Sequence, residues 1–329
     1  MRENLTGRVS RAERDIFTVL CEEKEYAARL GGAFFEEGAD RPVTGDVVTF
    51  SAVSEDEAVI EEIWPRKSVL KRADGSGHAP GYVKTMREQV MAANFDYGFI
   101  LTSLNENYNL NRIARYVAVI LEGGGIPVVL LTKADLCADT LTYIAEVTAL
   151  SERVRVHAIS AKTGEGLDEV RAYLKEGTTV VLLGSSGVGK STLVNRLVGR
   201  EVMKTGEIRE KDGKGRHTTT TRQMIVADGV TLIDTPGMRE LGLIDTETGV
   251  SNTFEDVEEI ACQCRFSDCT HGNEPGCAIR KALENGELDP NRWKMYSKMK
   301  NETNKNAKMK AIAIYQKKLN AAANRKKWD

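Results

Sequence analysis

Hydrophobic residues in the first 68 positions form short runs typical of β-strands, separated by Gly, Pro and acidic residues. These runs occupy residues 14–22, 26–31, 46–53 and 56–64. Several strands in so short a stretch predict a small barrel of the oligonucleotide/oligosaccharide-binding (OB) type or a similar one. Periodicity alone leaves a small open sheet as an alternative. Residues 66–83 mix basic residues with Gly and Pro, and we interpret them as a linker.

From residue 97 to residue 234, continuous apolar runs alternate with amphipathic segments. In the first such segment Ile113, Tyr116, Val117 and Ile120 follow the i, i+3, i+4, i+7 spacing of a helix. This alternation predicts a parallel sheet covered by helices on both faces, with ligands beyond the carboxyl ends of its strands. We expect strands at 97–101, 127–131, 154–159, 179–183, 223–226 and 230–234, and helices at 111–122, 140–150, 167–175 and 191–198.

The chain changes character from about residue 248, where it becomes rich in Cys and then in Lys, with a helix-like composition over 303–319. The net charge of the whole chain is −2, but residues 292–329 contain 12 Lys and Arg against 2 Asp and Glu. Without a membrane-length apolar run or a signal peptide, the six cysteines are expected in a reducing cytoplasm, as metal ligands or free thiols.

The stretch Gly184–Thr192, GSSGVGKST, satisfies the G-x-x-x-x-G-K-[ST] phosphate-loop pattern between an expected strand and an expected helix. Its glycines allow backbone N–H groups and the helix N-terminus to surround a phosphate. Lys190 is expected to reach the β- and γ-phosphates, and Ser191 to offer its hydroxyl to Mg²⁺. The alternative, a Gly/Ser turn with a solvated Lys, is disfavoured by the flanking strand and helix.

Three further motifs follow expected strands: Thr132–Asp135 (TKAD), Ser160–Lys162 (SAK) and Asp234–Gly237 (DTPG). The carboxylate of Asp135 can accept hydrogen bonds from N1–H and the 2-amino group of guanine, with the Lys133 stem packed on the base. Backbone N–H groups of SAK can meet the guanine O6. Within DTPG, the first residue can hold Mg²⁺ through water and the last can sense a γ-phosphate. Each motif alone could be an ordinary turn.

Together these motifs resemble those of translation-factor-class GTPases, but TKAD and SAK precede the phosphate loop, so the order is circularly permuted. The charge-rich segment 206–223 would provide switch I, and among its threonines we favour Thr220 as a Mg²⁺ ligand. Met238 stands where many GTPases keep a water-orienting Gln, which leaves His217 as the nearest catalytic candidate. A solvated, inert His is the alternative. Because DTPG leads into the C-terminal region, we expect the nucleotide state to be transmitted to residues 248–329.

Three thiols and one imidazole, Cys264, Cys269, His271 and Cys277, lie within 14 residues. Such a set can bind Zn²⁺ tetrahedrally with no open position, which indicates a structural zinc. Buried apolar cysteines are the alternative, and Cys262 could replace Cys264 as a ligand.

The chain as a whole resembles the ribosome small-subunit-dependent GTPase A family (RsgA, also called YjeQ or YloQ). The resemblance spans nearly the full length and rests on PVTGDVV, YNLNRIARY, LLTKADL, SAKTGEGL, GSSGVGKSTL, GRHTTT, LIDTPGMRE and CRFSDCTHGNEPGCAI. It implies an OB-like β-barrel over 1–68, a circularly permuted α/β P-loop GTPase domain over 69–247 and a zinc-binding, basic helical domain over 248–329. Thr132 departs from the family pattern, since many members have Asn there, and this affects the expected nucleotide affinity.

The resemblance further implies hydrolysis of GTP to GDP and phosphate, slow alone and stimulated by the small (30S) ribosomal subunit during its late maturation. The flanking domains would bind rRNA, and the protein would be a cytoplasmic monomer. The GTP-binding residues would be Thr132, Lys133, Asp135, Ser160, Ala161, Lys162, Gly184, Ser185, Ser186, Gly187, Val188, Gly189, Lys190, Ser191, Thr192 and Gly237. Mg²⁺ would contact Ser191, Thr220 and Asp234, His217 would be catalytic, and zinc would bind Cys264, Cys269, His271 and Cys277.

Two rival functions remain at this point. A non-catalytic RNA-binding scaffold would keep the nucleotide site only for stability and would show no turnover stimulated by rRNA. A P-loop kinase or ATPase, with TKAD a coincidence, would show no preference for guanine.

Overall fold

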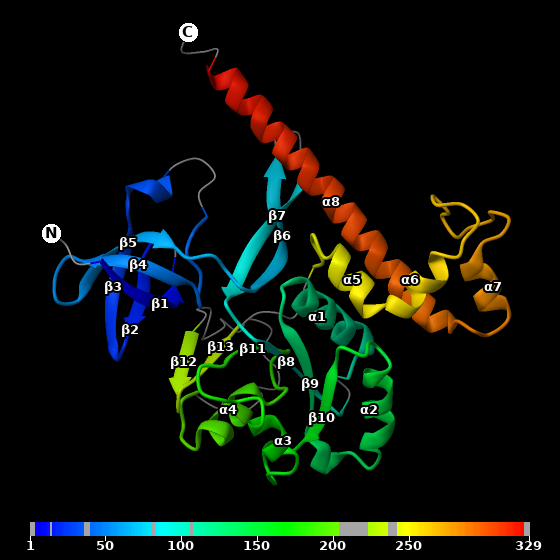
Figure 1. The fold of residues 1–329 in the computed structure, drawn as a ribbon, viewed down its shortest axis with the longest axis horizontal. Coiled ribbons are helices and arrows are strands. Elements are labelled where there is room, and N and C mark those ends of the chain that lie inside the picture. The colour runs from blue at the N-terminus through cyan, green and yellow to red at the C-terminus, as the bar shows by residue number, and fades with distance from the viewer. Residues whose placement is uncertain are drawn as a thin grey trace, which may run out of the picture.

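The computed structural model describes residues 4–13, 15–35, 40–79, 83–105, 108–203, 223–235 and 242–325. Five N-terminal strands close into a barrel in the order β1-β2-β3-β5-β4, because β1 pairs with both β2 and β4 (Figure 1). Alternate side chains such as Val9, Phe17 and Phe50 fill its interior. This closure selects the barrel over the open sheet. The elements are β1 (Asn4–Ala12), β2 (Phe17–Cys21), β3 (Lys24–Leu30), a 3-10 turn (Gly32–Phe35), β4 (Val47–Ala52) and β5 (Glu57–Ile63).

The prediction of a linker over residues 66–83 was wrong. Strands β6 (Val69–Ala79) and β7 (Val83–Ala93) form a long antiparallel hairpin. At its base Leu70 and Met91 are buried in the central core, and Lys71 forms an ion pair with Glu88 across the two strands. The register shifts between Asp74 and Gly77, as expected for glycine-containing strands. The hairpin depends on cross-strand contacts, so local composition did not reveal it.

The central sheet has the order β10-β9-β8-β11-β13-β12. Neighbouring strands are parallel except for the edge strand β12, which runs antiparallel to β13. Helix α1 (Leu110–Glu122) and helix α2 (Thr140–Thr148) belong to the core on one face, and α3 (Leu167–Arg171) and α4 (Lys190–Val198) to the core on the other. The strands are β8 (Tyr97–Ser103), β9 (Ile126–Thr132), β10 (Arg155–Ile159), β11 (Thr179–Leu183), β12 (Gln223–Ala227) and β13 (Val230–Asp234).

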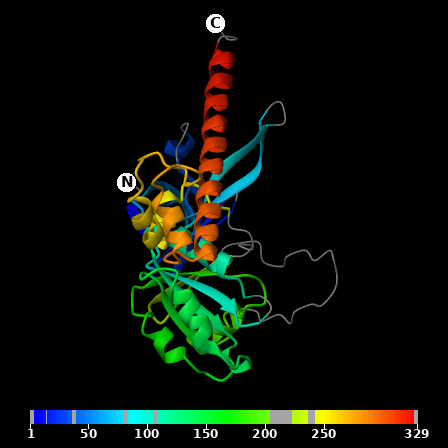
Figure 2. The ribbon, with the colours of Figure 1, turned by 90° about the vertical axis from the view of Figure 1, so that its right-hand side faces the viewer.

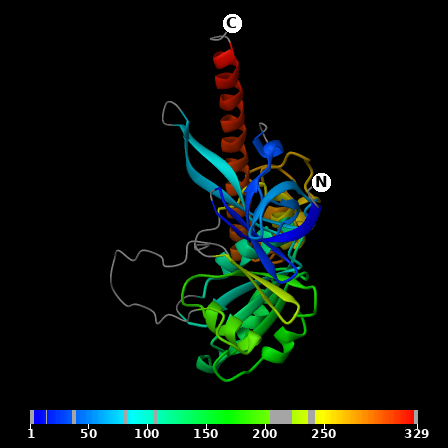
Figure 3. The same ribbon diagram turned by 90° about the vertical axis from the view of Figure 1, so that its left-hand side faces the viewer.

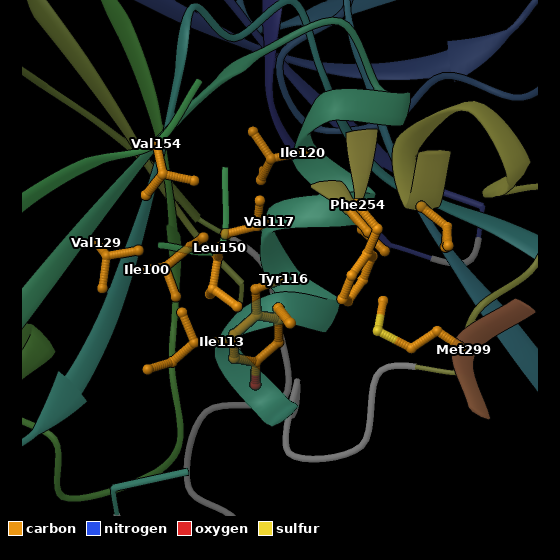
Figure 4. Close-up of a cluster of buried hydrophobic side chains, with 14 of the residues drawn as sticks. Ile100, Ile113, Tyr116, Val117, Ile120, Val129, Leu150, Val154, Phe254 and Met299 are labelled. Carbon is orange, nitrogen blue, oxygen red and sulfur yellow. The ribbon is translucent and has the colours of Figure 1, made fainter. Parts of the chain in front are cut away.

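One hydrophobic core joins the central sheet to the C-terminal helices. Figure 4 shows Ile113 and Val117 of α1 near Ile100 and Val129 of the sheet, with Phe254 and Met299 on the other side of the helix. The C-terminal helices are α5 (Glu247–Thr253), α6 (Glu255–Ala261), α7 (Ala278–Glu284) and α8 (Pro290–Arg325). Burial of this shared surface attaches the C-terminal quarter of the chain to the nucleotide-binding fold.

Helix α8 has 36 residues and is therefore about 54 Å long. It passes α5 and the β6–β7 hairpin and extends beyond both, as the three views of the ribbon show (Figures 1, 2 and 3). Within the described part of the chain, no helix is both long enough and apolar enough to cross a membrane.

Candidate nucleotide site and metal cluster

The predicted nucleotide-binding loops meet at one edge of the sheet. In the parallel register Thr132 lies opposite Ser103 on one side and Ile159 on the other. On the neighbouring strands Leu182 lies opposite Asp234, which places the ends of β11 and β13 at the same level. TKAD, SAK, the phosphate loop and the start of DTPG therefore leave the sheet from the same edge, although they are distant in sequence.

Backbone geometry explains why glycines occupy the phosphate loop. Gly184 has φ +152°, and a Cβ there would lie 2.8 Å from the carbonyl oxygen of Leu101. Gly187 and Gly189 have φ +81° and +98°, values that other residues rarely adopt. Gly189 is also the N-cap of α4, so the loop turns directly into the positive end of that helix. The loop has the tight, N–H-rich geometry that binds a phosphate.

Two charged groups lie close together beside this loop. Lys190 donates from Nζ to the carbonyl oxygen of Gly184 at 2.8 Å. Burial lowers the pKa of Lys190, and the nearby carboxylate of Asp234 opposes this change. Burial raises the pKa of Asp234, while attraction to Lys190 opposes that shift. Anionic phosphate would stabilise the ammonium, and a divalent cation would stabilise the carboxylate.

Unpartnered polar atoms in the site fit a ligand and a cation. Among the described residues, the buried Oδ1 of Asp234 and Oγ of Ser185 have no hydrogen-bond partner. Buried polar atoms in proteins are otherwise nearly always bonded. Ser191 is half-buried in the first turn of α4, and Ser186 and Thr192 are exposed. The carboxylate of Asp234 and the hydroxyls of Ser185 and Ser191 are oxygen ligands of the type that Mg²⁺ prefers.

Thr132 connects the TKAD motif to the phosphate loop. Its buried hydroxyl donates to the carbonyl oxygen of Val188 at 2.7 Å. The following residue, Lys133, adopts the left-handed conformation with φ +61°, and Asp135 is exposed in the short turn Ala134–Leu136. The hydroxyl of Thr132 thus stabilises the phosphate loop, at the position where many members of the family that the sequence resembles have Asn.

The SAK motif forms a tight turn at the same edge of the sheet. Ser160 is fully buried, and its Oγ accepts a hydrogen bond from the N–H of Thr163 at 3.2 Å. Ala161 is half-buried and Lys162 is exposed. Gly237, Thr220 and His217 lie outside the described residues, so their predicted contacts with the γ-phosphate, Mg²⁺ and water remain predictions.

Two hollows on the described surface lie away from these motifs. One of about 620 Å³ is lined by Lys67, Asp96, Ile126 and Thr178, at the opposite edge of the sheet. We assign the site from the chemistry of the loops, since a phosphate cradle built of backbone N–H groups needs no deep cavity.

The chain beyond DTPG is attached to α8 through residues that local sequence patterns did not mark. Glu302 accepts from the N–H of Leu243 at 3.1 Å and from Arg115 of α1 at 2.8 Å. Asn306 donates to the carbonyl oxygen of Leu243, and the hydroxyls of Thr246 and Thr303 lie 3.1 Å apart. The segment that follows the expected γ-phosphate sensor is therefore held along one face of α8.

The four predicted zinc ligands converge. One donor atom each from Cys264, Cys269, His271 and Cys277 lies within 4.8 Å of the other three. Nδ1 of His271 is 3.5 Å from Sγ of Cys264 and 3.7 Å from Sγ of Cys277. Cys262 is exposed and outside this group, so it does not replace Cys264. The ring of His271 packs edge-on against Trp293 of α8, with ring centroids 5.5 Å apart.

Thiol chemistry in this cluster fits a divalent metal. Burial disfavours the thiolate of Cys264, but N–H groups of Ala278 and Ile279 hold its pKa below the usual value. The pKa of Cys269 is raised to about 11, because burial and hydrogen bonds with the neighbouring thiols disfavour its ionisation. A bound cation would allow all three thiols to ionise together. The Cys₃His donor set is one that Zn²⁺ uses in structural sites.

The fold and the site define a P-loop GTPase whose motifs are circularly permuted. The family model described as "RsgA GTPase" matches residues 63–244, and one described as "50S ribosome-binding GTPase" matches residues 179–312. The chain belongs to the RsgA GTPase family. This result confirms the resemblance seen in the sequence, and the barrel, GTPase domain and Cys₃His cluster confirm the predicted fold class.

Similar proteins cover nearly the whole chain. A protein from Lactiplantibacillus plantarum named "Small ribosomal subunit biogenesis GTPase RsgA 2" is 42% identical over 91% of this chain and 83% of its own length. An RsgA of Streptomyces avermitilis is 44% identical over 91% of this chain and 79% of its own. The crystal structure of YjeQ from Thermotoga maritima covers 90% of this chain and 97% of its own, with 27% identity and a TM-score of 0.65.

Proposed function

We propose that this protein hydrolyses GTP to GDP and phosphate in the late maturation of the small ribosomal subunit, and that the subunit stimulates the reaction. The observation that carries this proposal is the convergence of the phosphate loop and TKAD at one sheet edge. It occurs in a chain whose relatives are named small ribosomal subunit biogenesis GTPases. The match to the family model described as "50S ribosome-binding GTPase" begins at residue 179, the first residue of β11, and includes the phosphate loop that follows. This match supports the GTPase chemistry.

Each residue of the nucleotide site would have a separate role in binding or hydrolysis. Asp135 would accept from the guanine N1–H and 2-amino groups, and its exposure leaves the carboxylate accessible to a base. Lys190 would leave the carbonyl of Gly184 for the β- and γ-phosphates. Ser191 and Asp234 would hold Mg²⁺, which neutralises charge that develops on the phosphates. Thr220, Gly237 and His217 would complete the site, with His217 positioning or activating the attacking water.

The C-terminal region would add a structural zinc ion at Cys264, Cys269, His271 and Cys277. All four ligands come from the protein, so no coordination position remains for a substrate. The barrel and the basic C-terminal region would bind rRNA. We place the protein in the cytoplasm as a monomer, since its proposed substrate complex is a ribosomal subunit and the described phosphate loop, TKAD and SAK come from one chain.

GTP hydrolysis should be measured with and without purified small ribosomal subunits. We expect strong stimulation that is absent with ATP and lost in Lys190→Ala. Asp135→Asn should shift the preference from GTP towards XTP, because an amide can no longer accept both guanine donors. GTP binding without stimulation would favour the scaffold alternative, and unchanged base selectivity in Asp135→Asn would remove the role of TKAD.

A further inference from the structure

The basic residues of α8 between positions 290 and 315, whose side chains the structure describes, separate into two groups. Those on the inner face are neutralised: Arg292 by Asp256, Lys300 by Glu258, and Lys310 by both Glu88 and Asp245. Four others are exposed, and no acidic group of the described residues lies within ion-pair distance of them. These four, the outer lysine stripe, are Lys294, Lys298, Lys305 and Lys308.

Their spacing places the outer lysine stripe on one line. Positions i, i+4, i+11 and i+14 lie within about 80° of one another around an α-helix, at about 100° per residue. The stripe spans about 21 Å along the axis, from 14 residues at 1.5 Å each. Asn301, also exposed, occupies the gap in the middle. The helix therefore presents a row of exposed lysines on the side opposite its buried residues Met295, Met299 and Thr303. Glu302 attracts Lys298 from one turn away, but its carboxylate is hydrogen-bonded to Arg115 and to the N–H of Leu243.

The chemistry of this row favours nucleic acid as its partner. Protein interfaces bury a largely apolar centre, but the outer lysine stripe and Asn301 in its gap offer only polar and charged side chains. A membrane-surface helix needs a free apolar face beside its basic one, but over 294–308 the large apolar side chains, Met295, Tyr296 and Met299, are buried. The exposed Ile312, Ile314 and Tyr315 lie beyond the stripe. Lys side chains are flexible point charges that contact phosphates without reading bases.

We propose that the outer lysine stripe binds the phosphate backbone of helical RNA in the small ribosomal subunit. This proposal rests on the proposed function, and it assigns the contact to one face of one helix. The binding is electrostatic and largely independent of sequence, because the four ammonium groups are flexible point charges that suit phosphates rather than one base. Helical RNA suits a straight row because its phosphates form continuous ridges along the groove edges.

The test replaces all four lysines of the stripe with Gln, which removes the charge and keeps a good helix former. Binding to purified small subunits, and separately to protein-free RNA extracted from them, should be measured from 50 to 200 mM salt. Near 150 mM salt we expect affinity for both to fall at least tenfold. The slope of log affinity against log salt should become shallower by about 3, as four lost phosphate contacts imply.

Two matched variants separate the possible outcomes. Lys→Arg at the same four positions should restore binding, and a remote set of four Gln substitutions should leave it unchanged: Arg155, Arg171, Lys175 and Arg200, on β10, α3 and α4 or beside them. Basal GTP hydrolysis should be equal in all variants, and the stripe variant should need more subunits for half-maximal stimulation.

Equal binding by the stripe and remote variants would overturn the proposal. Weaker binding to subunits but unchanged binding to free RNA would also overturn it, in favour of an acidic protein partner. Absence of stimulation in the unmodified protein would count against the proposed function instead.

Discussion

The attachment of residue 243 to α8 provides the sharpest test of how the nucleotide state reaches the C-terminal region. Only eight residues separate Asp234, the first residue of DTPG, from Leu243, whose N–H donates to Glu302. A shift of the DTPG loop on loss of the γ-phosphate would pull on this bond. We predict that Glu302→Ala uncouples α8 from the nucleotide site.

The size of the perturbation follows from what Glu302 contacts. The substitution removes the ion pair with Arg115, whose side chain is 20% exposed, and the acceptor for a buried N–H. Hydrogen bonds to charged groups contribute about 1.5–3 kcal/mol each, and partial exposure reduces the ionic part. We expect the free energy of local opening at this attachment to fall by about 2–4 kcal/mol. At 2 kcal/mol, amide exchange by local opening accelerates about thirtyfold.

Glu258→Ala is the matched control. Glu258 of α6 forms an ion pair with Lys300 of α8 and is about as exposed as Glu302. It accepts hydrogen bonds from Ser251, Tyr296 and Lys300, all of which lie outside residues 242–246.

Hydrogen exchange of residues 242–246 and 300–310 should be compared with GDP and with a non-hydrolysable GTP analogue. In the unmodified protein and in Glu258→Ala, protection should differ between the two nucleotides. In Glu302→Ala that difference should vanish from α8. If α8 exchanges identically in both states of the unmodified protein, or if the difference survives in Glu302→Ala, the coupling route is refuted.

Three further predictions concern the loop, the metal and pH. Thr132→Val removes the hydroxyl that donates to Val188, and should weaken GDP affinity about five- to tenfold in a fluorescent-nucleotide titration. Cys277→Ser should reduce zinc content by elemental analysis from one ion per chain towards none, with GDP affinity unchanged within about twofold, because the cluster is remote from the phosphate loop. Burial opposes ionisation of Glu258 and Glu302, yet hydrogen bonds from their cationic partners hold the pKa of each below its usual value. The native state therefore binds fewer protons, so the urea midpoint should be highest above about pH 4.5 and fall as the pH drops further.

Local patterns were sufficient where one element carries its own signal. The phosphate loop needs glycines at fixed positions because its backbone adopts positive φ, so the requirement is visible in sequence. The strands Thr179–Leu183 and Val230–Asp234 have the predicted limits, because both are buried along their length and mainly apolar. The zinc ligands fall within 14 residues, so three thiols and one imidazole in a short segment indicated the cluster.

Tertiary structure decided the features that depend on distant contacts. The β6–β7 hairpin has polar, Gly-containing strands and is held by pairing and by residues such as Leu70 that enter a core built elsewhere. The bond between Glu302 and Leu243 joins positions 59 residues apart, and nothing in either segment marks it. Composition predicted a basic, helical C-terminal segment, but only the folded chain shows which of its lysines form ion pairs with acidic groups. Sequence sets local backbone geometry and chemistry, whereas pairing across the fold determines how these parts act on one another.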